Sequence, residues 1–333
     1  MNPTVDVVIV NYKSSELTIK CLESLLIEKS TCTTHSVRTV IVENNSQDQN
    51  IDKLKTFITK SEYKEWVFFI ELNLNKGFGA GNNEGIRFFE RLSNRQENDS
   101  YFFFLNPDTL LLPQCLSKLL TFSTSNKQVT IVGPQHFDSN RHQVHSAFRF
   151  PNLLNTIDNS INFSLISNLF QKHSTIYKFS KTPHPVEWIS GAAMLIRKSS
   201  LKEIGFFDEH FFLYFEEVDL CKRAINKGFQ IWQIPDAHLI HLKGESSGIK
   251  RSQNQQKRIP EYWHKSRRLF LEKHYGIKKR ILYDFIFLTG SALEQVKEIL
   301  KLRIKRHPPF FFIDFLKYSL MIDKFIEKDP KPF

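Results

Sequence analysis

The sequence predicts an α/β protein with a mostly parallel, doubly wound sheet, followed by a helical extension at the C-terminal end. In the first half of the chain, short runs of β-branched and aromatic residues alternate with amphipathic segments of helical period. These apolar runs contain few polar residues, which is typical of strands that helices cover on both faces. After about residue 256 the periodicity is helical throughout. Strands that alternate with helices form parallel sheets, and the predicted fold class follows from this alternation.

The alternation begins close to the N-terminal end of the sequence. Residues 5–12 predict a buried strand, and apolar positions at helical spacing predict a helix over residues 15–28. Residues 39–44 and 67–72 predict the second and third strands. A glycine-rich turn, a helix that runs through Arg91 and a fourth strand ending in LNPD follow. In such a sheet, ligands bind beyond the carboxyl ends of the strands, and the functional residues are expected there.

The second half of the chain is less regular. Residues 129–135 predict a short strand, whereas residues 136–185 are polar and rich in histidine and are expected to form irregular loops. The elements expected next are a strand over 186–197, helices over 199–204 and 216–228, and a strand over 229–235. We place a domain boundary at residue 255, so that residues 1–255 form the α/β domain and residues 256–333 a basic, amphipathic helical extension.

Composition restricts the class of protein. Four cysteines, Cys21, Cys32, Cys115 and Cys221, lack the spacing of a zinc site or a disulfide framework. Without a signal-peptide pattern or an apolar run of about 18 residues, we expect a cytoplasmic protein that is neither secreted nor membrane-spanning. The net charge of +11 predicts an anionic partner. Because no nucleic-acid-binding motif is present, we expect that partner to be an anionic membrane surface and not nucleic acid.

Polar side chains follow several of the predicted strands. Asn11 follows the first strand, Glu43 and Asn44 the second, and Asp108 the fourth. In a doubly wound sheet these ends converge on one crevice, where a carboxylate after the second strand commonly binds a ribose or base. Such residues also cap and turn chains, and for Glu43 both roles stay open. Asp108 could bind Mg²⁺ or Mn²⁺ together with phosphate oxygens, or it could belong to an ordinary Asn-Pro-Asp turn.

The glycine-rich segment over residues 75–85 reads NKGFGAGNNEG. It has neither the spacing of a dinucleotide-binding fold nor that of a phosphate-binding loop. Glycines such as Gly77 would allow the backbone to approach a nucleotide closely, with Lys76 near the phosphates.

A cluster of acids follows the aromatic run FFLYF. Glu216, Glu217 and Asp219 lie within four positions, and their mutual repulsion is expected to raise at least one pKa toward the value of a general base. A helix N-terminus, whose dipole favours acids, is the alternative reading. After the last strand, His238 and His241 have a spacing that points their rings in different directions, and one of them could complete a metal site.

These segments together resemble the inverting family 2 glycosyltransferases, in the branch of bacterial rhamnosyltransferases. The resemblance covers roughly residues 5–275 and rests on motifs in family order: VVIVNY, VENNSQD, NKGFGAGNNEG, FLNPDT, SGAAMLIR, GFFDEHFFLYFEEVDLCKR and IPDAHLIH. It implies a GT-A fold for residues 1–255, a nucleoside diphosphate sugar as donor, and Mg²⁺ or Mn²⁺ to neutralise the leaving diphosphate.

The resemblance also assigns expected roles to residues. The donor-binding candidates are Asn11, Glu43, Asn44, Lys76, Gly77, Asn82, Asn106, Asp108, Trp188 and Gly191. Asp108 and His241 are the implied metal ligands, and Asn106 stands where the usual DxD motif has its first Asp. Glu217 is the implied general base, with Glu216 and Asp219 beside it as further catalytic candidates. The family pattern reads Glu-Asp-x-Asp at this point and has Asp more often at position 43, so this chain has Glu in place of Asp at two positions.

The implied reaction is a single displacement with inversion. We expect transfer of rhamnose from dTDP-rhamnose to a glycan or lipid-linked glycan acceptor, in the assembly of O-antigen, capsule or exopolysaccharide. A UDP-hexose donor stays open, as does a catalytically inactive nucleotide-binding protein, which the two Glu-for-Asp departures suggest. The basic, apolar C-terminal extension is expected either to contact the anionic inner face of the plasma membrane, or to form a helical pair that packs on the α/β domain or makes a homodimer.

Overall fold

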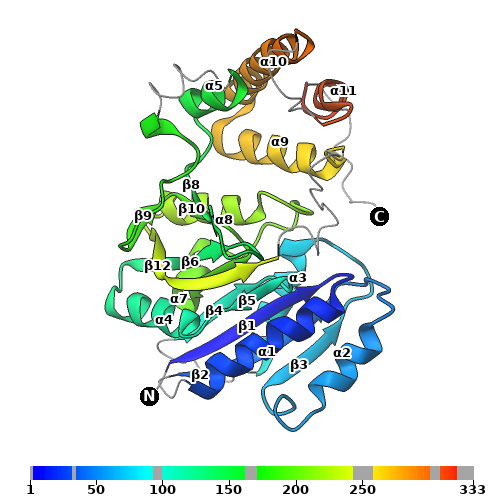
Figure 1. Ribbon diagram of the computed structural model, residues 1–333, viewed down its shortest axis with the longest axis vertical. Coiled ribbons are helices and arrows are strands. Elements are labelled where there is room, and N and C mark those ends of the chain that lie inside the picture. The colour runs from blue at the N-terminus through cyan, green and yellow to red at the C-terminus, as the bar shows by residue number, and fades with distance from the viewer. Residues whose placement is uncertain are drawn as a thin grey trace.

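A computed structural model describes residues 3–31, 35–92, 100–161, 171–242, 258–300 and 308–320. The strands of the main sheet are β1 (Thr4–Asn11), β2 (Ser36–Glu43), β3 (Val67–Glu71), β4 (Ser100–Leu105), β5 (Thr109–Leu111), β6 (Val129–Phe137), β7 (Gln143–Val144), β9 (His184–Val186), β11 (Ala193–Arg197) and β12 (Gln230–His241). They form a ten-stranded sheet in the order β3-β2-β1-β4-β11-β6-β12-β5, with β7 on β6 and β9 on β12 (Figure 1).

The sheet is mixed. β1 pairs in parallel with β2 and β4, β2 with β3, and β6 with β12. β11 runs antiparallel between β4 and β6, and β5 and β9 are antiparallel to β12. Because β11 is reversed, its amino end lies at the same edge as the carboxyl ends of β4 and β6. The predicted α/β class is confirmed, and the strands that run opposite to β1 are β5, β7, β9 and β11.

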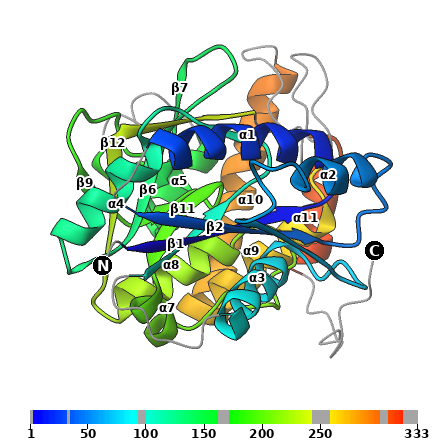
Figure 2. The same cartoon turned by 90° about the horizontal axis from the view of Figure 1, so that it is seen from below.

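Helices cover both faces of the sheet (Figure 2). The helices of the α/β part are α1 (Ser15–Thr31), α2 (Ile51–Ile58), α3 (Phe78–Leu92), α4 (Cys115–Ser125), α7 (Lys198–Ile204) and α8 (Glu216–Asn226). Figure 2 shows α1, α2 and α4 on one face and α3, α7 and α8 on the other. Val7 and Ile9 of β1 belong to the first core layer and Val8 to the second. This alternation explains the unbroken apolar runs, since both faces of each strand are buried.

The glycine-rich segment is mostly helix, which corrects the predicted turn. Helix α3 begins at Phe78 and contains the later glycines of the segment. A Cβ at Gly81 would lie 2.8 Å from Val10 Cγ1, and one at Gly85 would lie 2.4 Å from Val8 Cγ1. These glycines therefore allow α3 to lie against β1 at close distance, a contact that any larger side chain would prevent.

Two further expectations for the second half were wrong. The single strand predicted over residues 186–197 is broken into β9, β10 (Trp188–Ile189) and β11, because β10 leaves the main sheet to pair with β8 (Ala147–Phe148). The stretch over residues 136–185 is not uniformly irregular, since it contains the end of β6, β7, β8, helix α5 (Leu153–Ile161) and a short 3₁₀ turn (Gln171–His173).

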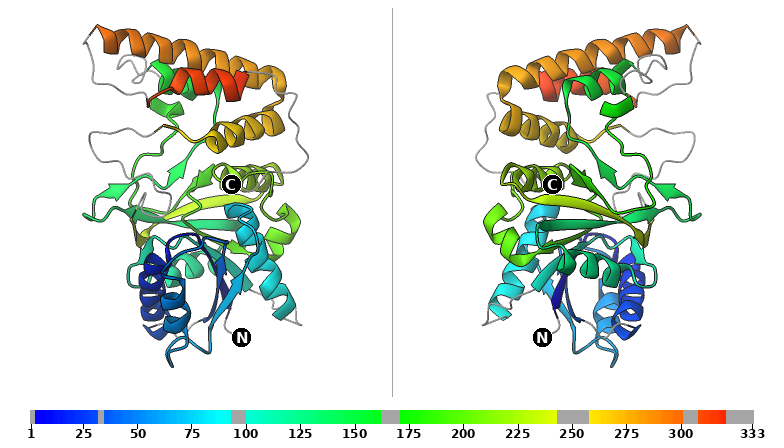
Figure 3. Two further views of the ribbon diagram at one scale, coloured as in Figure 1. Left: turned by 90° about the vertical axis from the view of Figure 1, so that its right-hand side faces the viewer. Right: turned by 90° about the vertical axis from the view of Figure 1, so that its left-hand side faces the viewer.

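The C-terminal part is helical, as predicted. Helix α9 (Glu261–Tyr275), α10 (Ile277–Ile299), α11 (Phe311–Phe315) and a π-helical turn (Leu316–Leu320) stack with α5 at one end of the molecule (Figures 1 and 3). A buried ion pair joins α9 to α10, because Arg267 of α9 contacts Asp284 of α10, which Arg280 of α10 also contacts. Because α5 packs on α10, this helical unit combines residues from both sides of the predicted boundary at 255.

Candidate active site

The predicted site residues lie at one edge of the sheet. β1, β2 and β12 end there at Asn11, Glu43 and His241, and β4 ends just before Asn106. The Asn106 backbone N–H donates to the carbonyl of Ala192, 2.9 Å away, immediately before β11 begins. This is the edge of an α/β sheet at which ligands commonly bind.

Asn11 and Glu43 are bonded to each other and to the adjacent loops. Asn11 Nδ2 donates to Glu43 Oε2, while Asn11 Oδ1 accepts from Ser14 Oγ at 3.0 Å and Thr18 Oγ1 at 2.7 Å. Glu43 Oε1 accepts from the Ser46 backbone N–H at 2.7 Å. These contacts fix the loops after β1 and β2, so for both residues they favour a positioning role over direct contact with a ligand.

Asn44 connects the end of β2 to the segment before α3. Its Nδ2 donates to Asn75 Oδ1 at 2.9 Å and to the Gly77 carbonyl at 3.1 Å. Gly77 has a φ of +95°, and a Cβ there would lie 2.0 Å from the Phe212 carbonyl oxygen. Only glycine permits both this conformation and this approach of the loop that leads to α8. Lys76 is exposed beside it.

Two aromatic residues with left-handed backbone conformation precede the acids. Tyr214 and Phe215 both have a φ of +68°, a conformation that costs free energy in bulky residues and must be held by its surroundings. Helix α9 holds it at several points: Ser266 Oγ donates to the Leu213 carbonyl at 3.0 Å, and the ring of Phe215 lies 5.6 Å from that of Phe270. The turn fixes where α8 begins and hence where its first acids point.

Glu216 and Glu217 open helix α8. The Oε2 atom of each is buried and accepts no hydrogen bond from the described part of the chain. Burial raises the pKa of Glu217 to about 7. Burial, and then the charge of Glu217, raise the pKa of Glu216 well above its ordinary value. The sequence predicts a raised pKa from crowding, whereas burial is the larger cause. Gly191 lies against the Glu217 side chain, where an added Cβ would be 3.3 Å from Glu217 Cβ.

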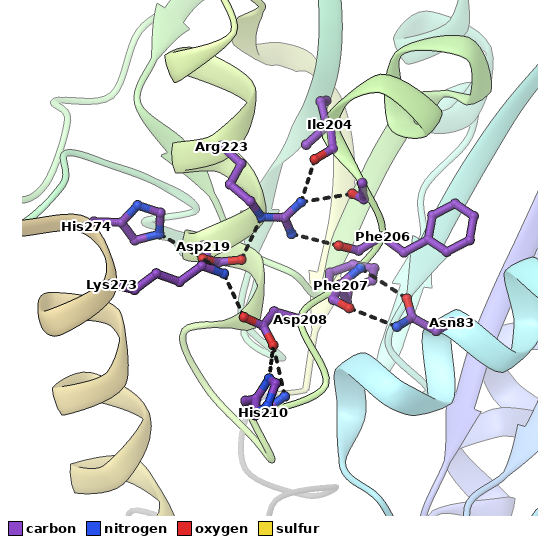
Figure 4. Close-up of polar contacts among 11 residues, drawn as sticks. Asn83, Ile204, Phe206, Phe207, Asp208, His210, Asp219, Arg223, Lys273 and His274 are labelled. Atoms are coloured by element: carbon purple, nitrogen blue, oxygen red, sulfur yellow. Dashed lines mark hydrogen bonds and ion pairs between the residues drawn. The ribbon is translucent and has the colours of Figure 1, made fainter.

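Asp219 has a different environment (Figure 4). Its carboxylate accepts from Arg223 Nε at 2.8 Å and contacts Lys273 Nζ and His274 Nε2 of α9, each at 2.7 Å. Burial would raise the pKa of Asp219, but the hydrogen bonds from His274 and Lys273 and the charge of Arg223 hold it below the ordinary value. These contacts favour a positioning role over the predicted catalytic one.

The same cluster fastens the loop before α8. Arg223 donates to three consecutive carbonyls, those of residues 204–206, and Lys273 also contacts Asp208. From α3, Asn83 donates to the Phe207 carbonyl at 2.9 Å and accepts from its N–H at 3.1 Å. Figure 4 shows these residues converging from α3, α8 and α9. Asn83 was not predicted from the sequence, although it stands beside the predicted Asn82.

Removal of the Asp219 carboxylate is expected to destabilise the fold. Asp219→Ala leaves Arg223, Lys273 and His274 without their shared anion, and we expect a loss of about 2–4 kcal/mol in unfolding free energy by urea titration. The pKa of Asp219 is depressed in the folded protein. The contribution of Asp219 to the free energy of unfolding is therefore fully present above pH 3.8, its ordinary pKa, and is lost as the pH falls below that value. The exposed Asp236→Ala is the matched control, and an equal loss in both variants would contradict the role assigned to this cluster.

Asp108 and His241 lie together at the end of β12. Asp108 is 2% exposed, and His241 Nε2 lies 3.4 Å from its Oδ1. His238 faces elsewhere and packs on Phe137, as the spacing predicted. His136, whose ring lies 5.6 Å from that of His241, was not predicted as a site residue. β6 continues through position 136 where loops were expected, because its pairing with β12 extends to Phe137, and no local pattern indicates this.

These two side chains fit a metal ion that is shared with a ligand. In the ranges that the structure describes, no three His, Cys, Asp or Glu side chains are close enough to hold an ion by themselves. Asp108 and His241 supply one carboxylate and one imidazole. Mg²⁺ and Mn²⁺ are commonly bound by one or two carboxylates together with phosphate oxygens, so a diphosphate would complete such a site.

The remaining candidates differ in their surroundings. Asn82 Nδ2 donates to the Phe78 carbonyl at 3.0 Å, within the first turns of α3. Trp188 stacks on Phe148 with ring centroids 4.3 Å apart and donates to the Arg149 carbonyl. The contacts of Trp188 favour a packing role, the alternative to ligand binding.

Several buried polar atoms at this edge have no hydrogen-bond partner in the described chain. They belong to the side chains of Asn44, Ser46, Asn82, Asn106, Glu216, Glu217 and His241, while others, such as those of Thr39, Ser123 and His264, are scattered elsewhere. Buried polar atoms in folded proteins are nearly always bonded, so a group of such atoms at one edge indicates a site for a polar ligand. A doubly covered mixed sheet with an acidic pair and a carboxylate–imidazole pair at one edge defines the class, an α/β protein of GT-A type with a site for a polar ligand.

Comparison with known proteins agrees with this class. Residues 6–205 match the sequence profile described as "Glycosyl transferase family 2". The chain belongs to this family.

Similar proteins refine the assignment. "Low-salt glycan biosynthesis hexosyltransferase Agl10" of Haloferax volcanii is 28% identical over 240 residues, covering 71% of this chain and 66% of that protein. "N-acetylglucosaminyl-diphospho-decaprenol L-rhamnosyltransferase" of Mycobacterium tuberculosis is 25% identical over 235 residues, covering 68% and 73%. The structure of "GalNAc-T7 with UDP, GalNAc and Mn2+" superimposes with a TM-score of 0.58 at 11% identity, covering 95% and 56%. The chain is thus rhamnosyltransferase-like with a GT-A fold, and it spans only about half of the GalNAc-T7 chain.

Proposed function

We propose that this protein is an inverting glycosyltransferase that moves a sugar from a nucleoside diphosphate to a hydroxyl group of a glycan or lipid-linked glycan. The observation that carries the proposal is the buried, unbonded Oε2 of Glu217. Burial raises the pKa of Glu217 to about 7, so its carboxylate can take a proton from the hydroxyl group of the acceptor sugar at neutral pH. This favours an active enzyme over an inactive nucleotide-binding protein.

The chemistry is a single displacement. Glu217 takes the proton of the acceptor hydroxyl while the hydroxyl oxygen forms a bond to the anomeric carbon. The bond from that carbon to the diphosphate oxygen breaks on the opposite face, and the configuration is inverted. Asp108 and His241 would hold Mg²⁺ or Mn²⁺, which when bound neutralises charge on the diphosphate. Support for a divalent ion comes from the Mn²⁺ named with the GalNAc-T7 structure.

The donor we favour is dTDP-rhamnose. Support comes from the motifs quoted above and from the similarity to an L-rhamnosyltransferase whose name specifies a decaprenol-linked acceptor. A role in surface polysaccharide assembly is consistent with both. A UDP-hexose is the second candidate donor, since another relative is named as a hexosyltransferase and the GalNAc-T7 structure contains UDP.

The test is consumption of a donor. The full chain is incubated with a panel of dTDP- and UDP-sugars, Mg²⁺ or Mn²⁺ and extracted membrane lipids, and released nucleoside diphosphate is measured. We expect dTDP-rhamnose to be consumed faster than the other donors. The anomeric configuration of the product, determined by NMR, should be inverted relative to that of the donor. Binding of a donor without any turnover would contradict the proposal and would support the inactive alternative.

A further inference from the structure

Exposed apolar side chains are concentrated on the C-terminal helices. Of the 16 large hydrophobic residues that are exposed in the described chain, ten lie between positions 277 and 316. We call them the C-terminal apolar surface: Ile277, Ile281, Leu282, Phe285, Leu293, Val296, Leu300, Phe310, Ile313 and Leu316. Single exposed apolar residues are normal, whereas a concentration of this kind marks an interaction site.

No helix or strand of the described ranges covers this surface. Helix α10 packs on α5 and α9 with the side that bears Tyr283 and Asp284, both buried. Ile277, Ile281 and Phe285, which follow one another at helical spacing, are 47–63% exposed on another side of the helix. Figure 3 shows α10 and α11 at the end of the molecule farthest from the N-terminus, so no other described element lies beyond them.

The charge around the surface is positive. Lys278, Lys279 and Lys317 are exposed on the same helices. The acids of these helices whose side chains the structure describes, Asp284, Glu294 and Asp314, are all buried, and Asp284 and Asp314 contact arginines, so they add little negative charge at the surface.

We propose that the C-terminal apolar surface docks on an anionic lipid bilayer. The apolar side chains would enter the boundary between head groups and acyl chains, and the lysines would bind anionic head groups. Docking is peripheral, because none of the helices described is both long enough and apolar enough to cross a membrane. A second copy of the chain would cover the apolar side chains but would bring like charges together, whereas anionic lipid satisfies both features.

The inference goes beyond the proposed function, since it concerns binding and not transfer. If the acceptor is lipid-linked, docking would also bring the site to its substrate. Helix α9 lies between α10 and the acids: Ser266 bonds to the turn before α8, and Lys273 and His274 contact Asp219. The docking surface and the acid pair therefore belong to one connected set of helices.

The experiment is co-sedimentation of the full chain with phosphatidylcholine vesicles that contain or lack phosphatidylglycerol. We expect binding to the anionic vesicles that weakens as salt increases. Phe285→Glu and the double variant Lys278→Glu/Lys279→Glu should each weaken binding at least about tenfold. Matched controls on α1 are Ile27→Glu, at a position that is 55% exposed, and Lys20→Glu, and neither should change binding.

Three results would overturn the docking proposal. These are failure to bind anionic vesicles, a lipid-free dimer by light scattering that Phe285→Glu dissociates, and vesicle binding that appears only after residues 321–333 are removed. The last would show that this segment covers the surface in the intact chain. Hydrolysis of the donor in lipid-free buffer is measured in parallel and should be unchanged in Phe285→Glu, so failure of docking and failure of the proposed activity are distinguishable.

Discussion

Glu217→Gln should lower kcat at least about 100-fold and change the affinity for the donor by less than about threefold. The amide has the shape of the carboxylic acid but cannot accept the proton of the acceptor hydroxyl. Donor consumption gives kcat, and calorimetry gives the affinity. Glu216→Gln is the comparison, since Glu216 was also a catalytic candidate and its Oε2 is likewise buried and unbonded.

The pH dependence of this reaction follows from the raised pKa. The base must be ionised, so kcat/KM of the wild-type protein should rise with pH up to about 7 and level off above it. A profile that rises instead near the ordinary value of 4.5 would contradict the role of Glu217 as a buried base.

Stability distinguishes this effect from misfolding. For an acid whose folded pKa is raised, the stabilising contribution is present below the unfolded value of 4.5 and is lost as pH rises through about 7. The buried carboxylate thus destabilises the wild-type fold at pH 8, and Glu217→Gln should be at least as stable there by urea titration. If Glu217→Gln were inactive and also less stable than the wild-type protein, the result would indicate a structural role for Glu217. It would contradict the assignment of Glu217 as the general base.

The sequence predicted the parts of the site that local pattern determines. Asn11, Glu43 and Asp108 could be placed at one edge because each stands at or shortly after the end of a buried apolar run, and the carboxyl ends of parallel strands lie at the same edge. The contacts that set the roles of Asn11 and Glu43 come from loops whose conformation the sequence pattern does not predict. Their mutual hydrogen bond joins positions 32 residues apart and satisfies groups that appeared available for a ligand.

Long-range packing determined what could not be predicted. Asp219 looked like a third acid of a catalytic cluster because its partners Lys273 and His274 lie more than 50 positions away, on a helix whose placement no local pattern specifies. The left-handed turn at Tyr214 and Phe215 has no glycine to reveal it, since tertiary contacts from α9 hold it and not intrinsic preference. The antiparallel direction of β11 likewise depends on its pairing with β4 and β6, which no local pattern specifies.

Asp108→Ala should lower kcat/KM at least about 100-fold and abolish the effect of the metal ion on nucleotide affinity. Asp108 is the buried carboxylate beside His241, and no third candidate ligand of the described chain accompanies them. Without it, the imidazole alone would have to hold a divalent ion that prefers oxygen. We therefore expect Mn²⁺ to tighten binding of the nucleoside diphosphate to the wild-type protein and to have little effect in the variant.

The measurement is calorimetric titration of dTDP and UDP with and without Mn²⁺, which does not depend on turnover. His241→Gln should retain part of the effect of Mn²⁺ on nucleotide affinity, because the Asp108 carboxylate remains. Asp236→Ala, which removes an exposed acid from β12, should retain all of this effect. A metal effect of wild-type size in Asp108→Ala would place the ion elsewhere. Loss of nucleotide binding even without Mn²⁺ would mean that Asp108 acts on the nucleotide or on the loop itself. Because Asp108 is 2% exposed, thermal unfolding of each variant must show that the fold is retained before either conclusion is drawn.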